Sequence, residues 1–155
     1  MGGTGFDAGR TPLGEGEAYA VSDNTGFRTT LDIAGHAAIA DEPVALGGTD
    51  QGPSPYGMLS AALAACTAMT MHSYAKLKAL PVSGIRVLVR HEKVHEVDCE
   101  HCETDAGAKI DRLERTIWID GVVPEPARER LLQIAERCPV HRTLQGAVRI
   151  VTRAG

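Results

Sequence analysis

The stretch "SPYGMLSAALAACTAMTMHSYAKLKALP", residues 54–81, decides the fold. Ser54 stands where a helix N-cap is expected, and Pro55 suits the first helical position because its φ is fixed and its missing N–H is not needed there. Lysines near the end of the stretch complement the negative end of the helix dipole, and Pro81 cannot continue the helix. The sequence therefore predicts one long helix from residue 55 to about residue 80.

The first four turns of this helix are apolar on every face, so no amphipathic stripe is present. A helix of this kind is buried between two layers, and one sheet cannot cover it. Either a second sheet of the same chain or a partner subunit has to supply the other wall.

Short apolar runs with turn signals between them surround the helix and predict strands. The long run after the helix alternates, is interrupted by a polar connection and alternates again, which is typical of a long hairpin. The expected strands are two or three in an antiparallel meander over 18–41, then 84–96, 110–121 and 147–153, with a loop at 42–53 and an amphipathic helix at 124–137. The fold class is α+β, with antiparallel sheets wrapped around a long buried central helix.

Length and composition favour one domain. Residues 1–16 contain six glycines and few apolar anchors, so they are expected to form a flexible arm, followed by a single domain over 17–155. The net charge of −4, without a basic run, argues against nucleic-acid binding. No apolar stretch reaches the length that spans a bilayer and no leader is recognisable, which predicts a cytoplasmic protein with no membrane association. In that compartment cysteines are more often catalytic, redox-active or metal-binding than bridged.

Cys66 lies in the middle of the apolar helix, where two interpretations are open. It is either an inert small hydrophobic side chain or a reactive thiol shielded from water. The helix dipole does not reach it, because it follows the N-cap by roughly 18 Å. A reactive Cys66 needs a cation, and the first 75 residues hold only Arg10, on the arm, and Arg28, on a predicted strand. Arg28 is therefore the candidate activator.

Cys138 directly precedes Pro139, which restricts it to extended backbone geometry. If Pro139 opens a short terminal helix, Cys138 is its N-cap, and the N–H groups of Val140 and His141 lower its pKa. The alternative is that Cys138 only ends the preceding helix in an apolar seam.

A C-x-x-C pair, Cys99 and Cys102, lies in the polar connection of the hairpin, with His95 nearby. Three interpretations stay open, which are zinc binding, a redox dithiol and a solvated loop. No second ligand pair completes a zinc site, so no metal is expected.

The segments Asp41–Ala75 ("DEPVALGGTDQGPSPYGMLSAALAACTAMTMHSYA") and Glu136–Leu144 ("ERCPVHRTL") together resemble the OsmC/Ohr family of osmotically inducible and organic hydroperoxide resistance proteins. The resemblance implies an intertwined homodimer with its active site at the subunit interface. It also implies a thiol peroxidase that reduces organic hydroperoxides, with Cys66 as the peroxidatic thiol and Cys138 as the resolving thiol. The expected reductant is an external dithiol such as dihydrolipoamide, and no bound cofactor is expected.

One departure from the family pattern concerns the first turn of the central helix, where Gly57 stands in place of a glutamate that holds the activating arginine. Arg28 then lacks its expected tether, for which the loop carboxylates Asp41, Glu42 and Asp50 are candidates. We expect Tyr56 and Met69 to line the substrate pocket. The departure keeps an alternative function open, that of a weakly catalytic or non-catalytic dimeric stress protein that binds a small apolar ligand in the interfacial pocket.

Overall fold

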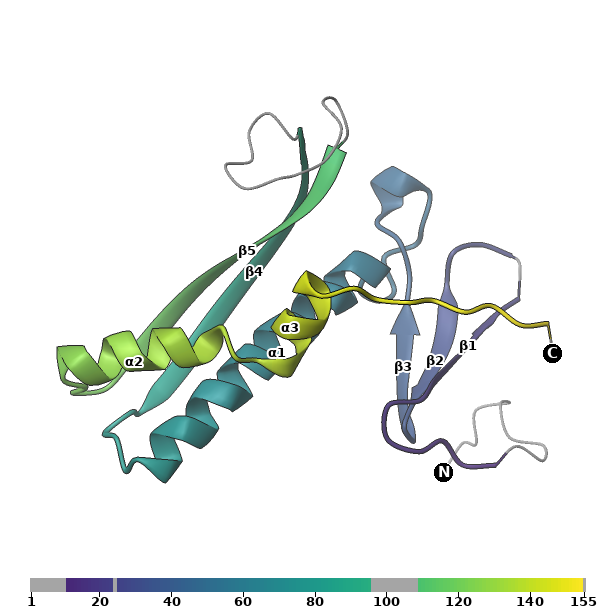
Figure 1. Ribbon diagram of the computed structural model, residues 1–155. Coiled ribbons are helices and arrows are strands. Elements are labelled where there is room, and N and C mark those ends of the chain that lie inside the picture. Colours follow the sequence, from purple (N-terminus) through teal and green to yellow (C-terminus); the bar gives the residue numbers. More distant parts are fainter. Residues whose placement is uncertain (1–10, 24, 96–108, 155) are drawn as a thin grey trace. The chain divides into compact units, whose positions relative to one another are not determined.

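The computed structural model describes residues 11–23, 25–95 and 109–154 (Figure 1). The chain forms two compact units, Met1–Met58 and Leu59–Gly155, and each is described by itself. Most of the predicted arm, residues 1–10, lies outside the described residues. The division into an arm and a single domain over 17–155 stays a prediction.

The first unit contains a three-stranded antiparallel meander, as the sequence predicts. Its strands, in spatial order, are β1 (Ala18–Ser22), β2 (Thr29–Ile33) and β3 (His36–Ala40). A two-residue turn joins β2 to β3, with positive φ at both Ala34 (49°) and Gly35 (89°). Such turns match the right-handed twist of the strands they connect, which fixes the pairing of Ile33 with His36.

The loop after β3 is organised around the carboxylate of Asp41, which is only 2% exposed. Three backbone N–H groups and one hydroxyl donate to this carboxylate, from Glu42, Thr49 and Gln51. These bonds, led by that of the Thr49 hydroxyl, lower the pKa of Asp41. A short 3-10 helix, Val44–Leu46, is the regular element of the loop.

Two glycines of this loop are required by close backbone contacts. A Cβ at Gly48 would lie 1.8 Å from the carbonyl oxygen of Glu42, and one at Gly52 would lie 2.3 Å from that of Ile39. Any side chain at either position would force the loop away from the sheet. The glycines of "GGTDQG" thus have a packing role.

The long helix α1 (Pro55–Leu77) ends three residues before the predicted end. Ala79 takes the left-handed conformation, with φ of 48°. The N–H groups of Leu80 and Ala79 then turn back to the carbonyls of Ala75 and Lys76. This is a Schellman cap, which stops the helix before Pro81 can do so.

Within the single chain, α1 is buried along one face only. Leu63, Thr67, Met71 and Ala75 follow one another at a spacing of four and are buried. Met69, on another face, is 68% exposed. The second wall, for which the sequence leaves a second sheet or a partner subunit as alternatives, is not supplied by the described part of the unit that contains these buried residues.

The second unit packs α1 and α2 onto a long hairpin (Figure 1). The hairpin and α2 confirm the prediction, although α2 is shorter at both ends than expected, and α3 is the short terminal helix that the sequence leaves as one of two alternatives. The elements are β4 (Gly84–His95), β5 (Lys109–Asp120), α2 (Glu125–Ala135) and α3 (Pro139–Gln145). The core cluster consists of Met71, Ala75, Ile119, Val123, Leu131 and Ala135.

The predicted final strand, residues 147–153, is absent from the described structure, where this segment has no regular secondary structure. Its apolar side chains are exposed, with Val148 at 62% and Ile150 at 86%. An alternating sequence forms a strand only where a neighbouring edge pairs with it. The described part of one chain offers this segment no such pairing.

Candidate active site

The structure brings the two predicted redox thiols together. Cys66 lies on α1 and is partly buried, whereas Cys138 lies in the turn between α2 and α3 and is completely buried. The two thiols interact electrostatically, and each shifts the pKa of the other. Because Cys138 is the N-cap of α3, the short terminal helix expected after Pro139 is confirmed.

The two thiols have opposite pKa shifts. Burial and the hydrogen bond to Cys138 raise the pKa of Cys66, and the Val140 N–H offsets this in part. Burial also acts to raise the pKa of Cys138, but hydrogen bonds from Cys66, the His141 N–H, the Thr67 side chain and the Val140 N–H outweigh burial and lower it. Cys138 is thus the easier thiolate, in the direction expected from helix capping, and Cys66 is its proton donor.

A largely buried cation, Arg115 of β5, binds residues that neighbour the two thiols in the sequence. Its side chain is 10% exposed. Its Nη1 donates to Thr67 Oγ1 at 2.9 Å and to the Ala135 carbonyl at 3.1 Å. Its Nη2 donates to Oε1 of Glu136 at 2.7 Å, and Nε2 of His141 lies 3.2 Å from the other oxygen of that carboxylate. Arg115 therefore links α1, the end of α2 and, through Glu136, α3.

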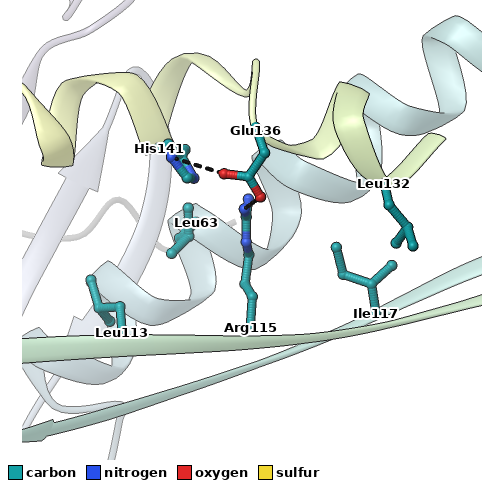
Figure 2. Close-up of a pocket in the computed structure, with 7 residues that line it drawn as sticks. All are labelled: Leu63, Leu113, Arg115, Ile117, Leu132, Glu136 and His141. Carbon is teal, nitrogen blue, oxygen red and sulfur yellow. Dashed lines mark hydrogen bonds and ion pairs between the residues drawn. The ribbon is translucent and has the colours of Figure 1, made fainter. Parts of the chain in front are cut away.

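A cavity of about 400 Å³ opens onto this network. Figure 2 shows Arg115 extending from β5 toward Glu136, with His141 on the other side of that carboxylate and aliphatic side chains around them. The described lining contains neither thiol. It consists of Leu63, Leu113, Arg115, Ile117, Leu132, Glu136 and His141.

Arg28, the predicted activator, belongs to the first unit. Its Nε donates to the side-chain oxygen of Gln51 at 3.1 Å. Its tether is therefore an amide, and the candidate carboxylate Asp41 is bonded within the loop instead. Arg28 and Gln51 both line a cavity of about 560 Å³ within this unit. Its action on Cys66 stays a prediction.

The first turn of α1 tolerates its unusual glycine well. The N–H of Gly57 donates to Ser54 Oγ at 3.1 Å, which confirms Ser54 as the N-cap. A Cβ at Gly57 would have the Ser54 hydroxyl as its nearest neighbour, at 3.3 Å. The position can therefore hold a longer side chain with a small movement of that hydroxyl.

The remaining candidate residues are not gathered at the thiols. Tyr56 is 46% exposed and Met69 is 68% exposed, and their role in a substrate pocket stays a prediction. Cys99 and Cys102 lie outside the described residues, and His95 is the last residue of β4. Within the described ranges, no group of three or more His, Cys, Asp or Glu side chains is arranged to hold a metal ion.

The sequence reasoning did not find Arg115. The choice of Arg28 rests on the cations of the first 75 residues alone, and β5 lies beyond them. A signal was present, because Arg115 alternates with Leu113, Ile117 and Ile119 on the face of β5 that packs against the helices. A cation on the apolar face of an alternating strand indicates a buried, paired charge.

The family model described as OsmC-like protein matches residues 48–153, more than half of the chain. The chain belongs to the OsmC-like family. The match includes both thiols and Arg115, whereas β1 to β3 precede it. No curated protein matches this OsmC-like chain.

Solved structures share the fold of this OsmC-like protein at low sequence identity. An OsmC-like protein from Mycoplasma pneumoniae is 21% identical, with 84% of this chain and 86% of that chain covered and a TM-score of 0.61. An organic hydroperoxide resistance protein OsmC from Legionella pneumophila is 18% identical, with 90% and 93% covered and a TM-score of 0.60. An organic hydroperoxide resistance protein from Elizabethkingia anophelis is 18% identical, with 83% and 86% covered and a TM-score of 0.60. These likenesses establish an OsmC/Ohr α+β fold.

Among the residues described, none of the helices has the length and apolar character needed to cross a bilayer.

Proposed function

We propose that this protein is a thiol-dependent peroxidase that reduces organic hydroperoxides. The observation that carries the proposal is the coupling of Cys66 and Cys138, which shift each other's pKa in opposite directions, with Cys138 the easier thiolate. Family membership and fold neighbours named as organic hydroperoxide resistance proteins support the substrate class.

Accessibility supports the assignment of roles. Cys66 is partly exposed, whereas Cys138 is completely buried, so a bulky hydroperoxide can reach only the first sulfur. The proton of Cys66 passes to the Cys138 thiolate along their hydrogen bond, which makes Cys66 the nucleophile. The Cys138 thiolate is thus the first proton acceptor and, later, the resolving group.

The chemical steps balance as follows. The Cys66 thiolate attacks the outer peroxide oxygen, the O–O bond breaks, and the alkoxide leaves as an alcohol after taking the proton held by Cys138. Cys66 is then a sulfenic acid, and the Cys138 thiolate attacks its sulfur to form a disulfide and release hydroxide, which becomes water with the proton that Cys138 loses when it returns to its thiolate after reduction. An external dithiol such as dihydrolipoamide reduces the disulfide to two thiols and is itself oxidised to a cyclic disulfide. This cycle fits a reducing compartment such as the cytoplasm.

A homodimer belongs to the same proposal. Small and apolar residues, Ala61, Ala65 and Met69, form an exposed row on α1, and the apolar segment 147–153 has no strand partner in the described chain. A second copy of the chain would cover both surfaces. Light scattering should therefore report a dimer, and Met69→Lys should shift it toward monomer, because the charge would be buried in the interface.

Peroxide consumption tests the function directly. Purified protein with dihydrolipoamide should consume cumene hydroperoxide over many turnovers, and Cys66→Ser should abolish the reaction. Cys138→Ser should leave one rapid turnover and stop the cycle. Loss of activity in Cys99→Ser instead, with Cys66→Ser unaffected, would assign the chemistry to the other cysteine pair and refute the proposal.

The second candidate function is an apolar-ligand-binding dimer with weak or no catalysis. The raised pKa of Cys66 and the glycine at position 57 favour it. A protein that binds a small apolar probe but leaves cumene hydroperoxide unchanged would support this alternative.

A further inference from the structure

Arg115 is a buried guanidinium whose hydrogen bonds converge on the turn that carries Cys138. A buried charge is tolerated where its donors are used, and three bonds from Arg115 end on Thr67, Ala135 and Glu136. The carboxylate of Glu136 balances the charge. Any effect of Arg115 on the thiols is therefore exerted through its hydrogen bonds more than through its positive charge.

Thr67 connects Arg115 to Cys138. Its side chain is completely buried, and its hydroxyl has one proton and two lone pairs. The oxygen accepts from Nη1 of Arg115 at 2.9 Å and lies 2.7 Å from the Leu63 carbonyl, to which it donates. The Thr67 side chain is also one of the groups that lower the pKa of the Cys138 thiol. A cation bonded to the oxygen makes that O–H a stronger donor.

The backbone of Cys138 is fixed by the same arginine. The Ala135 carbonyl accepts from the N–H of Cys138 at 3.2 Å and from Nη1 of Arg115 at 3.1 Å. Nη1 of Arg115 thus contacts both the Thr67 hydroxyl and the Ala135 carbonyl, and this carbonyl accepts the hydrogen bond from the main chain of Cys138.

We propose that Arg115 is a positioning residue of the redox pair, which holds the Cys138 sulfur against Cys66 through the Thr67 hydroxyl and the Ala135 carbonyl. The inference rests on the proposed function, because the redox cycle is what gives this thiolate its use. Arg115 does not touch the peroxide. Through these two groups it favours the thiolate form of Cys138 and holds the residue in place to take the proton of Cys66 and then to attack the sulfenic acid.

The test measures Cys138 without any peroxide. In a Cys66→Ser, Cys99→Ser, Cys102→Ser background Cys138 is the remaining cysteine, and ultraviolet thiolate absorbance follows its ionisation against pH. The charged and titratable groups around it are then Arg115, Glu136 and His141. Thr67→Val should lower the thiolate fraction at neutral pH about tenfold, the effect of one hydrogen bond to a charged group. Thr67→Ser, which keeps the hydroxyl, should leave the fraction unchanged.

Arg115 variants complete the test. Arg115→Met should lower the thiolate fraction about as much as Thr67→Val, and the double variant should lower it little further, because both act through one hydroxyl. The matched control is Arg112→Met on the other face of β5, where Arg112 pairs with Glu92. It should leave the titration unchanged. If Arg115→Met does not fold, the comparison of Thr67→Val with Thr67→Ser decides the test by itself.

The outcomes separate this inference from the proposed function. An unchanged titration in Thr67→Val would overturn the inference, even if the wild-type protein reduces hydroperoxides. Additive effects of Thr67→Val and Arg115→Met would also overturn the inference, since they would mean that Arg115 acts on Cys138 independently of the Thr67 hydroxyl. A lowered thiolate fraction in a protein that consumes no hydroperoxide would support the positioning role and refute the peroxidase instead.

Discussion

Oxidation of Cys66 and Cys138 to a disulfide should stabilise the protein strongly. The two thiols are near enough in the reduced structure to shift each other's pKa, so we expect the bond to form with little rearrangement. Cys138 follows Cys66 by 72 positions, and closing a loop of that length removes chain entropy from the unfolded state worth about 4 kcal/mol. With a urea dependence of about 2 kcal/mol/M, the unfolding midpoint should rise by about 2 M.

The assay compares urea unfolding of the reduced and diamide-oxidised protein at one protein concentration, in a Cys99→Ser, Cys102→Ser background. Mass spectrometry and a non-reducing gel first confirm that the bridge is within one chain. The Cys138→Ser variant, treated with the same oxidant, should show no shift. An oxidised protein no more stable than the reduced one would refute the reasoning, because it would mean that the fold has to distort to join these sulfurs.

Three further predictions follow from single positions. Gly57→Glu should stabilise the protein by about 1 kcal/mol and raise peroxidase activity, because it replaces a helical glycine and restores a capping box with Ser54; a lower melting temperature would contradict this. Asp41→Asn should destabilise the protein at neutral pH and leave it unaffected in strong acid. Because the pKa of Asp41 is lowered in the folded protein, its carboxylate stabilises the fold at pH values above the ordinary pKa of an aspartate. This stabilisation is lost as the pH falls through the pKa of the folded state, and melting curves recorded against pH test the sign. Leu131→Ala should cost about 2 to 5 kcal/mol by urea unfolding, whereas Leu132→Ala, at a 43% exposed neighbour, should cost much less.

Local chemistry made much of the fold predictable. The Ser54 cap, the alternating hairpin strands and the proline that opens α3 each act within a few residues, and the elements that depend on them are present. The end of α1 was misjudged, because the left-handed Ala79 depends on Leu80 packing into the core, which no neighbouring residue reveals. The final strand was predicted wrongly for a different reason. A strand forms only when its backbone pairs with a neighbouring strand, and the alternating pattern of residues 147–153 does not show whether such a neighbour exists.

The candidate site was predictable where helix ends determine it. The position of Cys138 at an N-cap indicated the direction of its pKa shift. Arg115 could not be paired with Thr67 from sequence, because 48 positions separate them and only the packing of β5 on α1 brings them together. The sequence predicts a carboxylate as the partner of Arg28, whereas the partner in the structure is the side-chain amide of Gln51.

The unequal burial of the two sulfurs has a consequence for damage by excess oxidant. A sulfenic acid becomes irreversibly sulfinic only if a second peroxide arrives before a thiol does. With Cys138 already in contact and enclosed by protein, the resolving step at Cys66 is intramolecular and needs no diffusion. The chain should therefore survive many turnovers at high peroxide, and Cys138→Ser should be inactivated after very few.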